Sequence, residues 1–140
     1  MYSDRARRIK KIIAQSTLSG VDPALSLGIA EQENKFLSTI SSDKLSAGIF
    51  QIKPSSAEQV LGFPVTMQRL IDDEDLNIKA GILYLKWLIR ELYNDIPAVI
   101  ASYNHGKATV QAGKINFGTD VYTQNVLGYQ AGWKTYLETV

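Results

Sequence analysis

The amino-acid sequence predicts a mainly α-helical fold, arranged as a single domain over residues 1–140. Apolar residues recur at helical spacing over about residues 75–93, in steps of four and three. Three further segments place a proline where the first turn of a helix accepts one. A composition typical of β structure occurs over residues 37–53. The chain shows no internal repeat and no linker, and its length suits one hydrophobic core.

The bulk composition is that of an ordinary globular protein, with 45% hydrophobic and 21% charged residues. The net charge of +1 gives no support for a nucleic-acid-binding protein. The absence of cysteine excludes disulfides and thiol catalysis. No apolar run approaches the ~20 residues of a membrane span. No signal peptide is predicted, because no long apolar segment follows the first charged residues. We therefore expect a chain that stays inside, leaves by another route, or is a fragment of a longer protein.

Two helices are expected in the N-terminal part of the chain. Ser3 or Asp4 can cap the first helix, and Gly20 can end it. The pair Asp22-Pro23 is a strong helix start, because aspartate caps a helix and proline fits its first turn. We expect this second helix to end at about Glu33.

The middle of the chain is expected to hold a small β element and a short helix. Residues 37–53 are rich in serine and β-branched residues, and we interpret them as a small hairpin or an extended turn. Pro54 opens a helix that Gly62 stops. Residues 64–74 are expected to be a loop with short helical pieces.

Two helices are expected after the central one. Pro97 opens the first, which His105-Gly106 ends, and residues 107–119 are predicted to be a loop around a short helix. The last helix is expected to start near Thr119-Asp120 and to continue to about Tyr129. Three apolar residues beyond it are interpreted as a C-terminal anchor: Trp133, Tyr136 and Leu137.

Basic residues are concentrated at the start of the chain, where five occur within eleven positions. A solvated helix face is the plainer interpretation. Contact with an anionic surface or with a protein partner is the alternative. The residues are Arg5, Arg7, Arg8, Lys10 and Lys11.

Two glutamates at the end of the second predicted helix are candidates for acid catalysis. Glu31 and Glu33 are two residues apart, about 200° around a helix, so they face different ways. A carboxyl group packed against apolar walls has a raised pKa and can hold a proton near neutral pH, as the cleavage of a glycosidic bond requires. Helical periodicity alone does not choose between the two, and a solvated or paired glutamate is the structural alternative.

Four sequence blocks occur in the order found in one enzyme family. Glu33-Asn34-Lys35-Phe36 resembles the E-S-x-F signature of soluble (SLT-type) lytic transglycosylases, which are relatives of goose-type lysozyme. The segment from Gly48 to Pro54 is similar to the G-L-M-Q-x-M-P block of that family. Asn77 to Leu85 matches N-I-x-x-G-x-x-Y-L, and Ala101 to Gly106 resembles A-A-Y-N-A-G. The blocks and the late Tyr122 span about residues 20–128.

The resemblance implies a mainly α, lysozyme-like single domain with a small β-hairpin near the active-site cleft. It implies peptidoglycan glycan strands as the partner and no cofactor or metal. Glu33 would be the single general acid/base. It would protonate the glycosidic oxygen between N-acetylmuramic acid and N-acetylglucosamine and then accept the proton of the 6-hydroxyl, which closes a 1,6-anhydro ring. Gln51, facing Glu33 from the hairpin, is an amide that cannot attack as a carboxylate does.

Further substrate-binding residues follow from the resemblance, and each has a structural alternative. Ser42 would contact substrate or form a turn, and Phe50 would form a cleft wall or pack in the core. Tyr103 would hydrogen-bond near Glu33 or the acetamido group, or anchor the fold. Asn104 would bind substrate or cap a helix. Tyr122 would line the cleft or pack in the core.

The sequence departs from the family pattern at several positions. Gly118 occupies the place of a usual acidic residue, and nearby Asp120 is expected to point elsewhere on a helix. Asn34 replaces serine beside the expected catalytic residue. His105, the one histidine, replaces a usual alanine, and without a second ligand nearby we interpret it as a loop residue and not as a metal ligand.

Two other functions stay open at this point. A hydrolytic, lysozyme-like muramidase would need a residue that positions water, and Asp43 in the predicted turn is the candidate, although it is also a typical turn residue. A non-catalytic peptidoglycan-binding or assembly protein could use the basic first helix as a partner surface. We expect a monomer that acts on the cell wall, in the periplasm, outside the cell or delivered by a phage.

Overall fold

Side-chain caps fix the starts of five helices in the computed structural model, which describes residues 2–140. An aspartate or threonine accepts a hydrogen bond from the backbone N–H of the first helical turn, which satisfies a donor that the helix itself leaves unpaired. The capping residues are Asp22, Thr66, Asp73, Asp95 and Asp120. The helices of the described residues are α1 (Tyr2–Ser19), α2 (Pro23–Asn34), α3 (Pro54–Leu61), α4 (Met67–Asp72), α5 (Glu74–Glu91), α6 (Ile96–His105), α7 (Lys107–Gln111) and α8 (Val121–Glu138).

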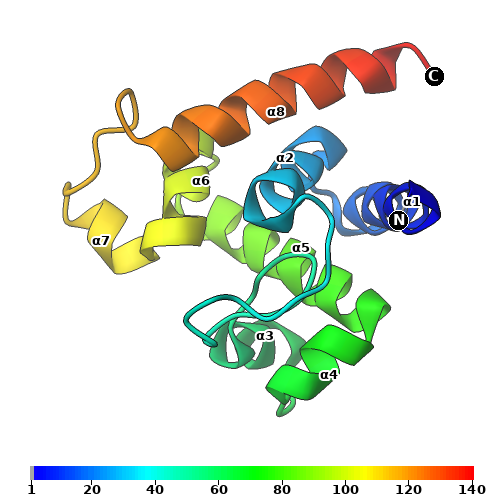
Figure 1. Ribbon diagram of the computed structural model, residues 1–140. Coiled ribbons are helices and arrows are strands. Elements are labelled where there is room, and N and C mark those ends of the chain that lie inside the picture. Colours follow the sequence, from blue (N-terminus) through cyan, green and yellow to red (C-terminus); the bar gives the residue numbers. More distant parts are fainter. Residues whose placement is uncertain (1) are drawn as a thin grey trace.

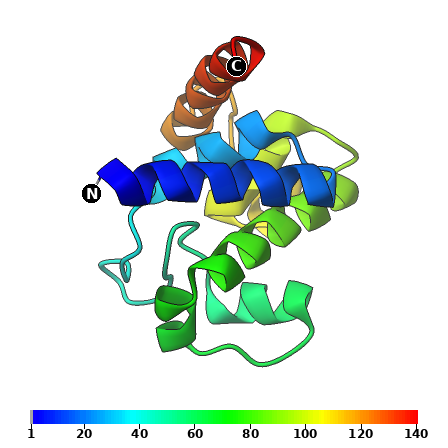
Figure 2. The same ribbon diagram turned by 90° about the vertical axis from the view of Figure 1, so that its right-hand side faces the viewer.

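The helices pack around α2 and α5 (Figure 1). Helix α8 crosses α2 and also contacts α6, whereas α3 and α4 pack against the other side of α5. Helix α1 lies lengthwise across α2 and α5 (Figure 2). The predicted mainly α-helical fold is confirmed, and no helix among residues 2–140 combines the length and apolarity needed to cross a membrane.

Helix α2 is buried on all sides over most of its length. Seven consecutive residues, from Ala24 to Ala30, are buried. Gly28 permits close packing on α8, because a Cβ atom there would lie 3.2 Å from the carbonyl oxygen of Val126 and from the amide nitrogen of Gln130. The polar end of this helix therefore emerges from the centre of the molecule, with Glu33 in its last turn.

Residues between α2 and α3 form a loop that the core holds in place. The predicted hairpin is not confirmed, because this loop shows two isolated antiparallel bridges, from Ala47 to Ile40 and from Ala47 to Ile52. The left-handed backbone of Gly48, at φ +83°, and of Gln51, at φ +46°, turns the chain sharply instead of extending it.

Several element boundaries differ from the sequence-based expectation. Helix α8 does not end at about Tyr129 but continues to Glu138, so the predicted C-terminal anchor belongs to this helix. Helix α1 already begins at Tyr2, which places Asp4 inside its first turn and not at a cap. His105 is the last residue of α6 and not a loop residue.

Candidate active site

Glu33 combines partial burial with a specific hydrogen-bond partner. Its Oε2 accepts a hydrogen bond from the hydroxyl of Tyr122, which lies in the first turn of α8. Burial raises the pKa of Glu33 from 4.5 to about 7, and the hydrogen bond from Tyr122 opposes this rise. Burial also raises the pKa of Tyr122 well above its ordinary value, so this hydroxyl stays protonated and can donate. The carboxyl group of Glu33 can therefore carry a proton near neutral pH.

A pocket of about 180 Å³ opens beside Glu33. Glu33 is the one carboxylic acid among its described lining residues. No group of three or more histidine, aspartate or glutamate side chains within residues 2–140 is placed to hold a metal ion. The residues that line the pocket are Glu33, Ser46, Gln51, Ile52, Lys53, Ser56, Tyr84, Ser102, Tyr103, Asn104, His105 and Gly106.

Asn77 holds the loop that forms one wall of this pocket. Its buried side chain donates to the carbonyl oxygens of Ala47, at 2.9 Å, and Leu70, at 3.0 Å. It also accepts from the backbone N–H of Phe50, at 3.0 Å. A Cβ atom at Gly48 would lie 1.9 Å from Nδ2 of Asn77, so this position requires glycine. The first residue of one predicted block thus fixes the first residue of another.

Gln51 lines the same pocket as Glu33. Its Nε2 donates to the carbonyl oxygens of Thr39, at 2.8 Å, and Gly48, at 2.9 Å. Both bonds use the amide nitrogen, so the side chain is held in one orientation by its own loop.

Phe50 is placed as a core residue. Its side chain is fully buried, and a Cβ atom at Gly81 of α5 would lie 2.3 Å from its Cγ. Its carbonyl oxygen accepts a hydrogen bond of 2.6 Å from the hydroxyl of Tyr103, a residue of the pocket lining. The position favours core packing over the alternative of a cleft wall.

The other predicted substrate residues differ in how close they come to the pocket. Tyr103 and Asn104 line it from the end of α6, and Asn104 is exposed. Tyr122 reaches it through Glu33. Ser42 is exposed and is not among the lining residues, whereas Ser46 of the same loop is.

Asp43 is occupied within the turn of the loop. Its Oδ1 accepts hydrogen bonds from the hydroxyl of Ser41, at 2.6 Å, and from the backbone N–H of Leu45, at 3.0 Å. The bond from Ser41 and then that from Leu45 lower the pKa of Asp43. Asp43 is not in the pocket lining, and its contacts are those of a turn residue.

The structure separates the two glutamates that periodicity did not. Glu31 faces away from the pocket, and its Oε1 accepts a hydrogen bond of 2.8 Å from Nε1 of Trp133. The distribution of partners therefore assigns the buried acid to Glu33. Sequence analysis named Trp133 only as part of a C-terminal anchor beyond the predicted last helix, so it did not show the contact with Glu31.

Sequence analysis missed one contact near the pocket and one buried hydroxyl without a partner among the described residues. Nε2 of His105 lies 2.8 Å from Oδ1 of Asp120, which joins the end of α6 to the start of α8. Asp120 is the cap of α8 and is not among the residues that line the pocket. The hydroxyl of Ser102, on the same face of α6 as His105, is buried without a hydrogen-bond partner among the described residues.

Most of the basic residues of α1 form ion pairs or hydrogen bonds within the molecule. Arg7, Arg8 and Lys11 all contact the carboxylate of Glu74 at the start of α5, at distances of 2.7–3.1 Å. Arg8 also donates to the carbonyl oxygen of Phe36, at 2.8 Å, in the left-handed turn that follows Glu33 and ends α2. This face of α1 therefore supports the site from behind.

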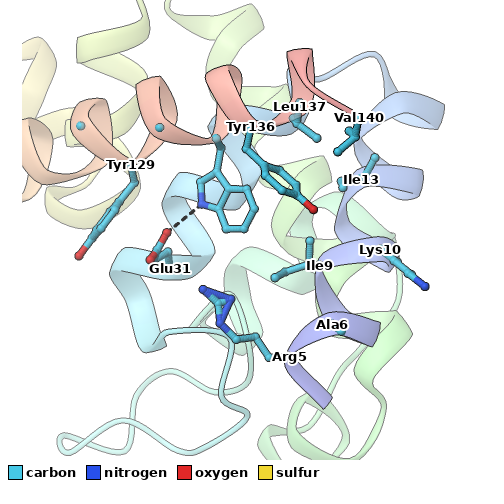
Figure 3. A pocket seen from close by; sticks show the side chains of 13 residues that line it. Arg5, Ala6, Ile9, Lys10, Ile13, Glu31, Tyr129, Tyr136, Leu137 and Val140 are labelled. Atoms are coloured by element: carbon cyan, nitrogen blue, oxygen red, sulfur yellow. Dashed lines mark hydrogen bonds between the residues drawn. The ribbon is translucent and has the colours of Figure 1, made fainter. Parts of the chain in front are cut away.

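A larger groove of about 790 Å³ lies elsewhere, between α1 and α8 (Figure 3). Ile9 and Ile13 of α1 face Tyr136 and Leu137 of α8 across it. The smaller pocket is the candidate active site despite its size, because it is the one that holds Glu33.

Comparison with known proteins gives one family match and several structural matches. The family model for the transglycosylase SLT domain matches residues 10–124. No sequence relative was found among curated proteins. Three similar solved structures share the fold of this chain, as the resemblance implied, and the chain spans about a quarter of the length of each.

The first is an inactive mutant of the lytic transglycosylase Slt from Pseudomonas aeruginosa, in which a glutamate is replaced by glutamine. It has a TM-score of 0.79 and 22% identity over 92% of this chain and 24% of that one. The second is the 70 kDa soluble lytic transglycosylase from Escherichia coli, with a TM-score of 0.74 and 23% identity over 91% of this chain and 24% of that one. The third, a 70 kDa soluble lytic transglycosylase in complex with bulgecin A, has a TM-score of 0.79 and 23% identity over 91% and 24% of the two chains.

Proposed function

The chain belongs to the transglycosylase SLT domain family, and we propose that it is a peptidoglycan lytic transglycosylase. The proposed reaction cleaves the β-1,4 bond between N-acetylmuramic acid and N-acetylglucosamine and forms 1,6-anhydromuramic acid. The observation that carries the proposal is Glu33, a partly buried carboxyl with a pKa of about 7 in a polar pocket. Such a group can donate a proton at neutral pH and accept one later in the same cycle.

Glu33 performs both proton transfers in this proposal. Its protonated form donates to the glycosidic oxygen as the bond to C1 of muramic acid breaks. The resulting carboxylate then accepts the proton of the 6-hydroxyl, whose oxygen attacks C1 and closes the anhydro ring. The cycle ends with Glu33 protonated again and consumes no water. A pKa near 7 suits both halves of the cycle, because neither protonation state is strongly disfavoured.

The absence of another carboxyl group among the described lining residues supports the intramolecular reaction over a two-carboxylate one. A retaining glycosidase of the usual kind needs a second carboxylate about 5–5.5 Å away as nucleophile, and an inverting one needs a base about 6.5–9.5 Å away. The amide of Gln51 lines this pocket with Glu33 instead, and an amide can orient a sugar but cannot take either role.

The proposed substrate-binding residues differ in their distance from the pocket. Gln51, Tyr103 and Asn104 line the pocket and are proposed to bind the sugars next to the cleaved bond. Tyr122 is proposed to affect the substrate indirectly, through its hydrogen bond to Glu33. For Ser42 and Phe50 the proposal is narrower.

The exposed Ser42 would contact a sugar bound beyond the pocket. Phe50 would shape the cleft from within the core, through the carbonyl oxygen that holds Tyr103. Bulgecin A, which is present in the complex of a 70 kDa soluble lytic transglycosylase, is proposed as a ligand to test on this chain.

The decisive experiment is mass spectrometry of the muropeptides released from purified peptidoglycan. We expect the wild type to release products that end in 1,6-anhydromuramic acid and Glu33→Gln to release none. Glu31→Gln is the matched control, because it makes the same chemical change two residues earlier on the same helix, at a side chain outside the pocket. Release of the same products by Glu33→Gln would show that the assignment to Glu33 is wrong.

The same experiment decides between this function and its two alternatives. Reducing ends one water heavier would indicate a hydrolytic muramidase, and Asp43→Asn would then be tested. The contacts of Asp43 with Ser41 and Leu45 favour the transglycosylase. Binding of peptidoglycan without any release by the wild type would indicate a binding or assembly protein.

The setting of the activity follows from the proposal. The site of action is the cell wall, and residues 1–140 are proposed to act as one domain and as a monomer, which light scattering would test. Arg7, Arg8 and Lys11 form ion pairs with Glu74. We therefore propose that a protein partner of α1 binds in the groove between α1 and α8 and not at these three residues.

An acidic amphipathic peptide is the appropriate probe of this groove, because Arg5 and Lys10 contribute its positive charge. Its binding should shift the NMR signal of the Trp133 indole N–H. An unchanged signal at millimolar peptide would remove the partner proposal.

A further inference from the structure

His105 and Asp120 connect the two helix ends that carry the tyrosines of the site. Nε2 of His105 and Oδ1 of Asp120 are 2.8 Å apart, and the side chains are 29% and 15% exposed. Burial opposes the ionisation of Asp120, but hydrogen bonds from Thr123 and from His105 outweigh it and lower the pKa of Asp120. An ionised carboxylate only accepts hydrogen bonds, so Nε2 of His105 is the donor.

The second oxygen of Asp120 organises the first turn of α8. Oδ2 accepts from the backbone N–H of Thr123, at 3.0 Å, and from its hydroxyl, at 2.6 Å. Tyr122 lies between these two residues, so its backbone is held within the cap. A carboxylate bound on one oxygen by His105 and on the other by Thr123 has a single orientation, and this orientation sets the start of the helix.

We propose that His105 is a positioning residue of the active site, which acts through Asp120 to hold the hydroxyl of Tyr122 against the carboxyl group of Glu33. The route is short and runs through consecutive hydrogen bonds and one helical turn. This inference rests on the proposed function for its effect on catalysis, but its structural part can be measured without substrate.

The middle of α8 is held independently of this pair. Val126 is buried, and its carbonyl oxygen lies close to Gly28 of α2. Near the helix start, Gln124 donates from Nε2 to the carbonyl oxygen of Phe117, at 2.8 Å, within the same chain segment. Loss of the His105 contact should therefore loosen the first turn, with Tyr122, and leave the packing of α8 on α2 in place.

The position of His105 makes this device a feature of the present chain. The family pattern A-A-Y-N-A-G has alanine there, which cannot form the contact. The same pattern provides Tyr103 and Asn104, the two residues immediately before His105. A histidine two residues after Tyr103 thus adds a link between α6 and α8 at the edge of the pocket.

The ionisation of Glu33 reports the contact directly. The hydrogen bond from Tyr122 lowers the pKa of Glu33 against the effect of burial. If the hydrogen bond from Tyr122 is weakened, the pKa of Glu33 should therefore rise. Carbon-13 NMR of labelled glutamate carboxyl groups measures this pKa in the folded protein, with Glu33→Gln assigning the signal and Tyr122→Phe giving the full effect of the missing hydroxyl.

We expect His105→Ala to raise the pKa of Glu33 by about half a unit or more, in the same direction as Tyr122→Phe. Release of muropeptides should show kcat reduced several-fold with KM little changed, because the groups that contact substrate remain. His105→Gln keeps an N–H donor and should restore the wild-type pKa and kcat.

The outcomes separate a positioning role from a purely structural one. A lower Tm for His105→Ala with an unchanged pKa of Glu33 and unchanged kcat would overturn the inference. A His105→Gln variant that behaves like His105→Ala in pKa would overturn it as well. If the wild type releases no muropeptides, the proposed function fails, but the pKa comparison still decides whether His105 positions Tyr122.

Discussion

Tyr122 donates a hydrogen bond to Glu33 across 89 residues of sequence. This contact joins the start of α8 to the end of α2 and places a donor that cannot ionise at neutral pH on a carboxyl group that can. Burial of Glu33 and this single hydrogen bond act in opposite directions on its pKa. The balance between them sets the pH range over which the proposed acid is available.

The pH dependence of activity tests this balance. We expect kcat/KM to be highest below about pH 7 and to fall about tenfold per pH unit above it, because the proton needed for the first step is then lost. Tyr122→Phe removes the opposing hydrogen bond, so the fall should begin at higher pH by about 0.5–1 unit. The measurement is the rate of muropeptide release between pH 5 and pH 9, with Glu31→Gln as control. If kcat/KM falls at the same pH in the wild type and in Tyr122→Phe, Tyr122 does not change the pKa of Glu33.

The stability of the folded state should also depend on Glu33. Its pKa is raised on folding, so the folded state binds the proton more tightly than the unfolded state does. Stability is therefore full below about pH 4.5 and is lost as the pH rises to about 7, by up to about 3 kcal/mol. Glu33→Gln should remove this dependence and be more stable than the wild type above pH 7. Urea unfolding at pH 4 and pH 8 measures the difference, and an equal change at both values would contradict the prediction.

Asn77→Ala should destabilise the protein and loosen the loop that carries Gln51. The variant removes the side-chain hydrogen bonds to the backbone groups of Ala47, Phe50 and Leu70, and we expect a loss of about 2–4 kcal/mol. Hydrogen exchange should become faster at the amide of Phe50 in particular. Asn125→Ala, at an exposed position of α8, is the control and should change neither quantity. Unchanged exchange at Phe50 would mean that Asn77 does not anchor the loop.

Gly81→Ala should lower the free energy of unfolding, although most glycine-to-alanine changes in helices raise it. The added methyl group would overlap the ring of Phe50, so we expect a loss of about 1–3 kcal/mol. Gly128→Ala is the matched control, because nothing lies within 4 Å of a Cβ atom there, and it should gain about 0.5–1 kcal/mol. Thermal unfolding compares the two. A double variant with Phe50→Leu should lose less than the sum of the single changes, and strict additivity would argue against the overlap.

Glu74→Gln should weaken the attachment of α1. The pKa of Glu74 lies well below its usual range, chiefly because Arg7 donates to it, with burial opposing and Arg8 and Lys11 adding to the effect. Its stabilising contribution is present above about pH 4.5 and is lost as the pH falls below this value. We expect the variant to lose about 2 kcal/mol at pH 7 and less in acid. Asp75→Asn, which removes the exposed partner of Lys11, is the control and should cost far less. Equal losses at pH 7 and pH 3 would contradict this.

Much of the fold could be predicted from local signals. Asp22-Pro23 starts α2, and Pro54 and Gly62 bound α3, because these residues act on the backbone beside them. The hairpin was not confirmed, since the side chain of Asn77, thirty residues away from Ala47, holds that loop instead of strand pairing. No local pattern reports such a contact.

The site shows the same division between local and distant effects. The resemblance to a known family implied Glu33, Gln51, Tyr103 and Asn104 as site residues, and all four line one pocket. It did not show that the acid is bound by Tyr122, because this depends on how α8 crosses α2. The contact between His105 and Asp120 was missed for the same reason, since each residue alone is typical of a loop or a cap.

The packing of α8 on α2 has a consequence for the newly made chain. Glu33 is synthesised early, but Tyr122 and the helix that follows it come last among the described elements. Until α8 has docked, Glu33 lacks both its cover and its donor, so it behaves as an ordinary solvated carboxylate at neutral pH. In an unfinished or truncated chain that stops before Asp120, Glu33 is thus present but is not protonated at neutral pH. A protonated Glu33 at neutral pH is therefore expected only after α8 has docked on α2.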